Sequence, residues 1–209
     1  MPSGRPAGVN LGAVALRVAV FCGSNTGSSG DHVEHAALLG STLAQRGIGL
    51  VYGGGHVGLM GAVADAALAG GGEVIGVITE HLVGAEIAHN GVTTLEVVGS
   101  MHQRKARMCD LADGFIAMPG GYGTLDEVLE ILTWNQLGMI AKPVVFLDPS
   151  GYFRSLLQFF DTAVDSGFIR GSHRALAQRA WTVDEAIDVA TGPGPSTAHK
   201  WIDRDASRA

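Results

Sequence analysis

The chain has 209 residues, enough for one domain with a sizeable core. Its 14 basic and 20 acidic residues give a formal net charge of −6, and no basic block occurs, which argues against duplex nucleic acid as a partner. No apolar run approaches the length of a membrane span, and the two cysteines, Cys22 and Cys109, fit neither a disulfide framework nor a metal site. We therefore expect a protein of the reducing cytoplasm.

Apolar runs of strand length alternate with helical patterns along the chain. Strands are predicted at residues 15–21, 48–52, 73–78, 94–98, 114–118 and 142–147, with a short last one near 180–183. Helices are predicted between them: at 31–46 with Asp31 as its cap, from the glycines after residue 52 to 69, at 100–112, from the glycines after residue 118 to 137, at 152–165 and at 184–190.

This alternation indicates an α/β fold that is Rossmann-like, with an open, mostly parallel sheet of about seven strands and helices on both faces. We expect one domain over residues 14–191, a loose tail at 1–13 that is no signal peptide, and a disordered tail at 192–209. Ligands bind such sheets beyond the carboxyl ends of the strands. Three glycine-rich loops, after the first, second and fifth predicted strands, converge there.

The most informative of these loops follows the fifth strand and reads Pro-Gly-Gly-Tyr-Gly-Thr-Leu-Asp-Glu, residues 119–127. A strand that ends in glycines and opens a helix can bind phosphate, because the backbone approaches the anion and free N–H groups point at it. Glu127, expected in the first helical turn, would then lie near a ribose. Thr124 and Glu127 also have the spacing of a helix capping box, which needs no ligand. A helix cap does not require three glycines, so we favour a ligand-binding role for this loop.

Arg104 is the second candidate. Met101, Met108 and Leu111 define an inward stripe of the predicted helix, and Arg104 falls on that stripe. A guanidinium near a core needs an anion, because it cannot lose its charge. The alternatives are a structural carboxylate as its partner, or a side chain that extends into water.

The segment Gly53-x-Gly55-x-x-Gly58 matches the dinucleotide-binding fingerprint, and Glu80 lies where a ribose-binding acid is expected. In a chain with 31 glycines this single match is weak, and close packing of a strand on a helix explains it as well. No metal site is predicted, because four histidines show no paired ligand spacing: His56, His81, His89 and His102.

The helix after the glycine loop is apolar on two sides. One face is formed by Leu125, Val128, Leu129 and Leu132, and the other by Ile131, Trp134 and Leu137. We expect one face to meet the sheet and the other to meet a second subunit. The alternative cover for the second face is the C-terminal segment of the same chain.

Together these patterns resemble the Lonely Guy family of cytokinin-activating phosphoribohydrolases. Residues 119–127 fit the family pattern Pro-Gly-Gly-x-Gly-Thr-x-x-Glu, and residues 101–105 fit its pattern Met-His-x-Arg-Lys. The resemblance extends from about residue 17 to about residue 190. The chain departs from it at Asp126, where many relatives carry Glu, and at Ser100, where an acid often precedes the second motif.

The resemblance implies hydrolysis of the N-glycosidic bond of an adenosine 5′-monophosphate, typically N6-isoprenoid, to a free base and ribose 5-phosphate. It implies no cofactor, and a homodimer with the site near the interface. Arg104 and Glu127 match the catalytic pair. The other positions matching substrate contacts are Glu86, Lys105, Gly120, Gly121, Tyr122, Gly123, Thr124, Leu125, Asp126 and Thr133. Further nucleotide contacts are expected at Gly23, Ser24, Gly54, Gly55 and Met101.

Three other functions stay open at this point. A nucleotide-binding module without hydrolysis would share the fold, but it would not need both Arg104 and Glu127. A dinucleotide-dependent oxidoreductase rests on the segment 53–58 alone. A lysine decarboxylase would need a lysine that forms a Schiff base with pyridoxal phosphate, and the chain offers only Lys105, Lys142 and Lys200.

Overall fold

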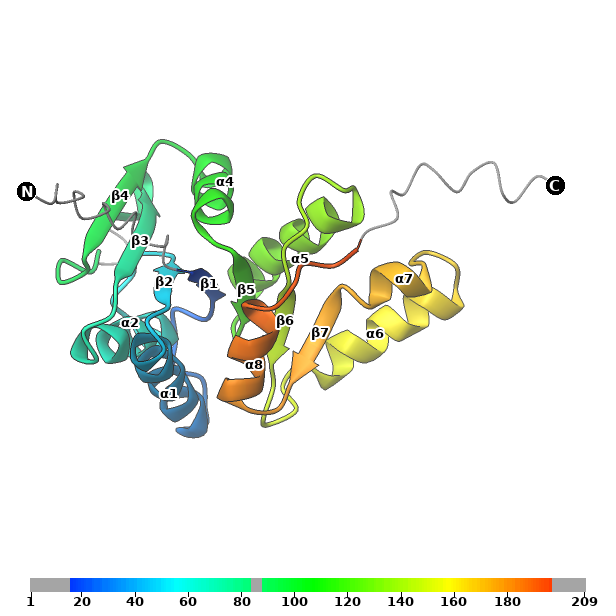
Figure 1. Cartoon of the computed structure of the whole chain (residues 1–209), viewed down its shortest axis with the longest axis horizontal. Helices are drawn as coiled ribbons and strands as arrows, with labels where there is room; N and C mark the ends of the chain where they lie inside the picture. The colour runs from blue at the N-terminus through cyan, green and yellow to red at the C-terminus, as the bar shows by residue number, and fades with distance from the viewer. Residues whose placement is uncertain (1–15, 84–87, 197–209) are drawn as a thin grey trace, which may run out of the picture.

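Seven strands form one parallel sheet in the computed structural model, which describes residues 16–83 and 88–196 (Figure 1). Their order is β4-β3-β2-β1-β5-β6-β7, which confirms the predicted fold class. The strands are β1 (Arg17–Phe21), β2 (Gly49–Tyr52), β3 (Val74–Thr79), β4 (Thr94–Val98), β5 (Gly114–Ala117), β6 (Val144–Leu147) and β7 (Ala177–Ala180).

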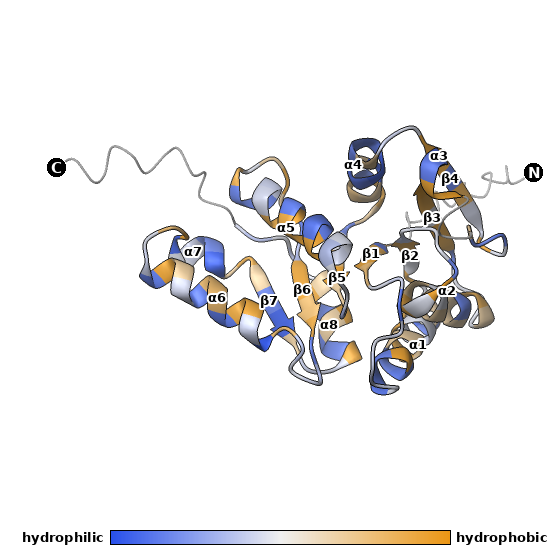
Figure 2. Ribbon diagram, turned by 180° about the vertical axis from the view of Figure 1, so that it is seen from behind, coloured by the Kyte–Doolittle hydropathy of each residue, from blue (hydrophilic) through white to orange (hydrophobic). Residues whose placement is uncertain are grey.

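The helices cover both faces of this sheet, because its inner strands are apolar on both sides (Figure 2). The helices are α1 (Asp31–Gln45), α2 (Gly58–Ala69), α3 (Glu80–Val83), α4 (Met101–Leu111), α5 (Tyr122–Gln136), α6 (Arg154–Asp165), α7 (Gly171–Arg174) and α8 (Val183–Ala190). Within the described ranges, no helix is both long and apolar enough to cross a membrane.

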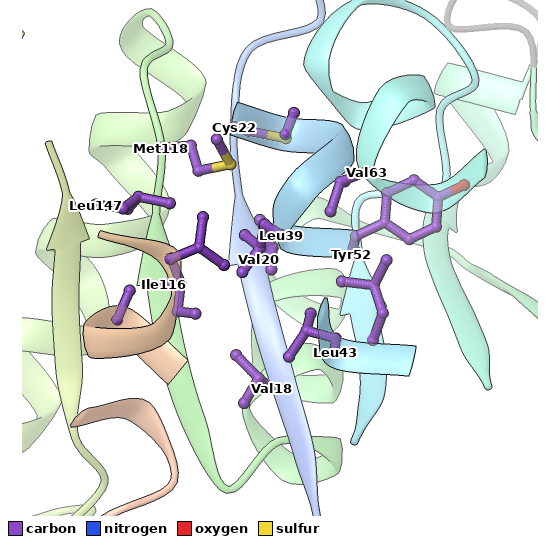
Figure 3. Packing of buried hydrophobic residues seen from close by; sticks show 14 of the residues in the cluster. Val18, Val20, Cys22, Leu39, Leu43, Tyr52, Val63, Ile116, Met118 and Leu147 are labelled. Atoms are coloured by element: carbon purple, nitrogen blue, oxygen red, sulfur yellow. The ribbon is translucent and has the colours of Figure 1, made fainter. Parts of the chain in front are cut away.

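Each face of the sheet has its own hydrophobic core. One core joins α1, α2 and α8 to the strands, and its centre is shown in Figure 3 with Val20, Leu39 and Ile116 among the labelled side chains. The other joins α4, α5 and α6 to the strands around Phe115 and Phe146. The two helices that carry the main candidate residues, α4 and α5, therefore lie on the same face.

The structure differs from the prediction at several element ends. The last strand is Ala177–Ala180 instead of 180–183, because Thr182 caps α8: its hydroxyl accepts from Glu185 N at 3.2 Å. Asp31 does not cap α1, whose N-cap is Gly30 without a side-chain bond. The short helices α3 and α7 were not predicted, and residues 192–196 form neither helix nor strand.

The direction in which the sheet is built reverses at β1. The chain adds β2, β3 and β4 on one side of β1, and β5, β6 and β7 on the other. In open α/β sheets a ligand crevice lies at such a point, beyond the carboxyl ends of the strands. The loops after β1 and β5 meet here, since Gly23 N donates to Pro119 O at 3.0 Å. The fold thus places the first and third glycine loops side by side.

Candidate active site

A cavity of about 560 Å³ opens at this edge of the sheet, which is within the usual size range of small-molecule sites. Its walls come from the loops after β1, β2 and β5, from α4 and from the start of α5. The predicted site residues that line it are Gly23, Ser24, Met101, Arg104, Gly120, Gly121, Tyr122, Gly123, Thr124 and Glu127.

Arg104 of α4 and Glu127 of α5 face each other in the wall of this cavity. Arg104 Nη2 and Glu127 Oε1 are 3.4 Å apart, and both side chains are buried. Within the described part of the chain, Arg104 Nε has no hydrogen-bond partner. Burying two charges costs solvation free energy, so such a pair in a cleft is typical of a functional site.

Glu127 is not a capping residue. Helix α5 begins at Tyr122, two residues before the predicted cap, and its N-cap is Gly121, which makes no side-chain cap bond. The capping-box interpretation of Thr124 and Glu127 is therefore wrong, and so is the placement of Glu127 in the first turn: it is the sixth residue of α5. The capping explanation therefore does not apply to this carboxylate, which pairs with Arg104 in the cavity wall.

The glycines of the loop have two different roles. A Cβ at Gly120 would overlap Thr124 Oγ1, so the packing of the protein itself requires glycine there. A Cβ at Gly121 or Gly123 would meet nothing within 4 Å. These two positions leave open space beside the first N–H groups of α5, which no side chain caps. Open space and free donors at a helix start favour an anion.

Cys22 lies in the cavity wall but is not a nucleophile. Burial, and then the charge of Glu127, raise the pKa of its thiol far above the physiological range. The thiol therefore stays protonated, as expected for a small core residue at a strand end.

Lys105 lies between α4 and α5 and not in the cavity lining. Its Nζ is 3.0 Å from both Asp126 Oδ2 and Glu130 Oε2. Burial lowers the pKa of Lys105, but the bonds to Glu130 and Asp126 outweigh it and raise the pKa overall. The pairs hold α4 against α5 beside Arg104. The substrate contact of Lys105 stays a prediction.

Five other predicted contacts are not brought to this cavity by a single chain. Its lining residues do not include Leu125, Asp126 and Thr133 of α5, nor Gly54 and Gly55 of the loop after β2. Thr133 instead lines a second, apolar pocket on the outer side of α5. Glu86 lies outside the described residues.

The glycine pattern after β2 is explained by close packing. Gly58 has a positive φ of 64°, and a Cβ there would overlap the backbone of Ser24. Leu59 N also donates to Gly23 O at 3.0 Å, which ties the second loop to the first. Glu80 is exposed at the start of α3 and does not line the cavity. The arrangement therefore gives no support to a dinucleotide site.

Several lining residues were not predicted from the sequence. Polar side chains from the loop after β1 and from α1, and a tyrosine from the loop before α6, join the wall: Asn25, Thr26, Ser28, His32 and Tyr152. Apolar contacts come from Leu59, Met60 and Leu82. The Gly-Ser-rich composition of residues 23–30 was a signal for the first group. Nothing in the sequence pointed to Tyr152.

We expect Gly53→Ala to lower kcat by about a hundredfold, because a displacement of about 1 Å in a catalytic group can have that effect. A Cβ at Gly53 would overlap Arg104 Nη2, so the guanidinium must shift from its position in the cavity wall. Gly171→Ala is the matched control, since a Cβ there meets nothing within 4 Å. Unchanged kcat in Gly53→Ala, with both variants folded by circular dichroism, would contradict a catalytic position for Arg104.

Comparison with known proteins adds family evidence to this geometry. A family model described as "Possible lysine decarboxylase" matches residues 60–190. A probable cytokinin riboside 5′-monophosphate phosphoribohydrolase of Oryza sativa subsp. japonica is 52% identical, over 77% of this chain and 70% of that protein. A cytokinin riboside 5′-monophosphate phosphoribohydrolase of Arabidopsis thaliana is 49% identical, over 82% and 79%. The molybdenum cofactor carrier protein of Chlamydomonas reinhardtii has a similar structure, with a TM-score of 0.63 and 26% identity over 83% of this chain and 94% of that one.

Proposed function

The chain belongs to the family of cytokinin riboside 5′-monophosphate phosphoribohydrolases, and on this premise we propose that it cleaves adenosine 5′-monophosphates, N6-modified ones included. Water would break the N-glycosidic bond and release the free base and ribose 5-phosphate. The buried pair Arg104–Glu127 in the cavity wall is the observation that carries this proposal. We place the reaction in the cytoplasm, where the two free cysteines, Cys22 and Cys109, would stay reduced.

The site has the groups that this reaction needs. Cleavage of the bond builds positive charge on the ribose, as in other glycoside hydrolyses. Glu127 would stabilise that charge and orient the attacking water, and its burial strengthens the interaction. Arg104 places a positive charge 3.4 Å from the carboxylate. The first N–H groups of α5 would bind the 5′-phosphate, which supplies binding energy away from the reacting bond.

The proposal is tested by incubating the protein with AMP and with an N6-isoprenoid AMP, followed by chromatography of the products. We expect free base from both, at rates that depend on the enzyme concentration. Nucleotide that binds but is recovered intact would contradict hydrolysis and favour the non-hydrolytic binding module.

Lysine decarboxylation is disfavoured by where the lysines lie. Lys105 is paired with Asp126 and Glu130, and Lys142 Nζ donates at 2.7 Å to both Cys109 O and Ala112 O at the end of α4. Neither lines the cavity, and Lys200 lies outside the described residues. A Schiff base would need a lysine amine inside the site. An absorbance spectrum of the purified protein without a pyridoxal phosphate band would agree with this conclusion.

We also propose a homodimer, formed through the outer side of α5. The predicted division of this helix into two faces is partly wrong: Val128 and Ile131 both pack into the core, and Leu129 is 38% exposed. Leu129 and Thr133 line an apolar pocket between α5 and the α6–α7 segment. An apolar surface of this kind is typical of an interface. Thr133 does not line the cavity of its own chain, so its predicted substrate contact would require a nucleotide bound by another copy.

We expect Leu129→Glu to produce a monomer with lower activity, because the carboxylate would be buried in the apolar contact. Leu38→Glu is the matched control: Leu38 is 52% exposed on α1, on the opposite face of the sheet. Light scattering and kcat/KM are measured on both variants. A monomeric wild-type protein, or a fully active monomer of Leu129→Glu, would refute the proposed interface.

A further inference from the structure

Tyr152 makes a direct bond to the glycine loop of the site. It lies between β6 and α6, and its hydroxyl donates to Gly120 O at 2.6 Å. The ring lines the cavity, is 49% exposed and meets the ring of His32 edge-on at 6.0 Å. The proposed hydrolysis assigns no role to this side chain.

This bond fixes the orientation of one peptide unit. The Gly120–Gly121 peptide is trans, so its carbonyl and its N–H point in opposite directions. With the carbonyl held by Tyr152, the Gly121 N–H is turned away from the tyrosine hydroxyl. Gly121 is the N-cap of α5 and lines the cavity, and a Cβ at this position would meet nothing within 4 Å. Tyr152 therefore sets the direction of a donor at the helix start.

An ion pair between a buried aspartate and a partly exposed arginine holds the loop that carries Tyr152. Asp148, at the end of β6, is completely buried; its Oδ1 accepts from Phe153 N at 3.1 Å, and its Oδ2 is 2.6 Å from Arg179 Nη2. The Arg179 guanidinium in turn lies 3.5 Å from the centre of the Trp181 ring. The pair thus ties residues 148–153 to β7. The buried Asp148 carboxylate needs such a partner, and the pair places the loop at the cavity.

We propose that Tyr152 is a positioning residue for the phosphate end of the substrate, and that Asp148 with Arg179 is its anchor. The hydroxyl keeps the Gly120–Gly121 peptide in the orientation that presents a donor to the phosphate. The inference rests on the proposed function only in assigning the residue 120–124 turn to the 5′-phosphate.

The test is Tyr152→Phe, which removes only the hydroxyl of a half-exposed side chain. We expect the dissociation constant of ribose 5-phosphate, measured by calorimetry, to rise about three- to tenfold, the usual effect of one lost hydrogen bond. KM for AMP should rise by a similar factor while kcat stays within about twofold. The affinity for adenine should not change, because adenine carries no phosphate for this turn to bind. Unchanged ribose 5-phosphate binding would overturn the proposal.

The anchor is tested with Asp148→Asn, alone and combined with Tyr152→Phe. If Asp148 acts through Tyr152, the double variant binds ribose 5-phosphate no more weakly than Tyr152→Phe alone. Effects that multiply instead would show two independent roles and refute the anchor. Glu73→Gln is the control, because Glu73 pairs with Arg17 at 2.7 Å near the amino ends of the strands, outside the cavity lining. Calorimetry needs no turnover, so a wild-type protein that binds ribose 5-phosphate without cleaving AMP would refute only the proposed hydrolysis.

Discussion

Replacing Glu127 with glutamine is expected to lower kcat by about two to four orders of magnitude, the usual range for loss of a general acid–base group. Glutamine has nearly the same shape and can still accept a hydrogen bond from Arg104. It lacks the charge that stabilises a ribosyl cation. Since Glu127 does not cap α5, the loss cannot be attributed to fraying of the helix start. The measurement is kcat under saturating AMP.

Glu130→Gln is the matched control for this variant. Glu130 lies one turn further along α5, pairs with Lys105 and does not line the cavity. We expect it to keep kcat within a few-fold of wild type. Thermal unfolding of both variants separates lost chemistry from lost stability, because removing one partner of a buried pair can be destabilising. A Glu127→Gln enzyme with near-normal kcat would leave Arg104–Glu127 as a structural pair.

The 5′-phosphate is expected to be required for efficient cleavage. Two charge-assisted hydrogen bonds at about 1.5 kcal/mol each correspond to about a hundredfold in kcat/KM. The donors that we propose are the N–H groups at the start of α5 and the hydroxyls of the loop after β1, among them Ser24, Thr26 and Ser28. We therefore expect AMP to be cleaved at least that much better than adenosine.

The same comparison is made with a nucleoside that carries an N6-isoprenoid group and with its monophosphate. If the phosphate contributes the binding energy, the ratio of the two kcat/KM values is similar for both bases. Comparable kcat/KM values for riboside and monophosphate would rule out a phosphate site at α5.

The sequence predicted most of the fold because its signals are local. Continuous apolar runs such as 114–118 indicate strands buried on both faces, and the glycine loops mark where those strands end. The reversal of strand order at β1 then brings the loops together. Arg104 could be predicted as a candidate because it is a charged residue on a helical stripe that is otherwise apolar. A charge at such a position needs a partner.

The remaining features depend on contacts between distant parts of the chain. The N-cap of α5 was misplaced by three residues because Thr124-x-x-Glu127 imitates a capping box, whereas the observed N-cap is Gly121. Tyr152 is 32 residues from Gly120 in the sequence, and no periodic pattern in the sequence indicates a hydrogen bond between them. Lys105 lies on α4 and its two ion-pair partners lie on α5. These ion pairs could therefore not be predicted from the sequence around Lys105.

The most direct test of the central claim is the stoichiometry of the products from AMP in a buffer free of phosphate and pyrophosphate. Hydrolysis at the pair Arg104–Glu127 predicts one adenine and one ribose 5-phosphate for each AMP consumed, with both lost together in Glu127→Gln. Base that forms only when phosphate or pyrophosphate is added, or AMP that binds and is recovered unchanged, would contradict it.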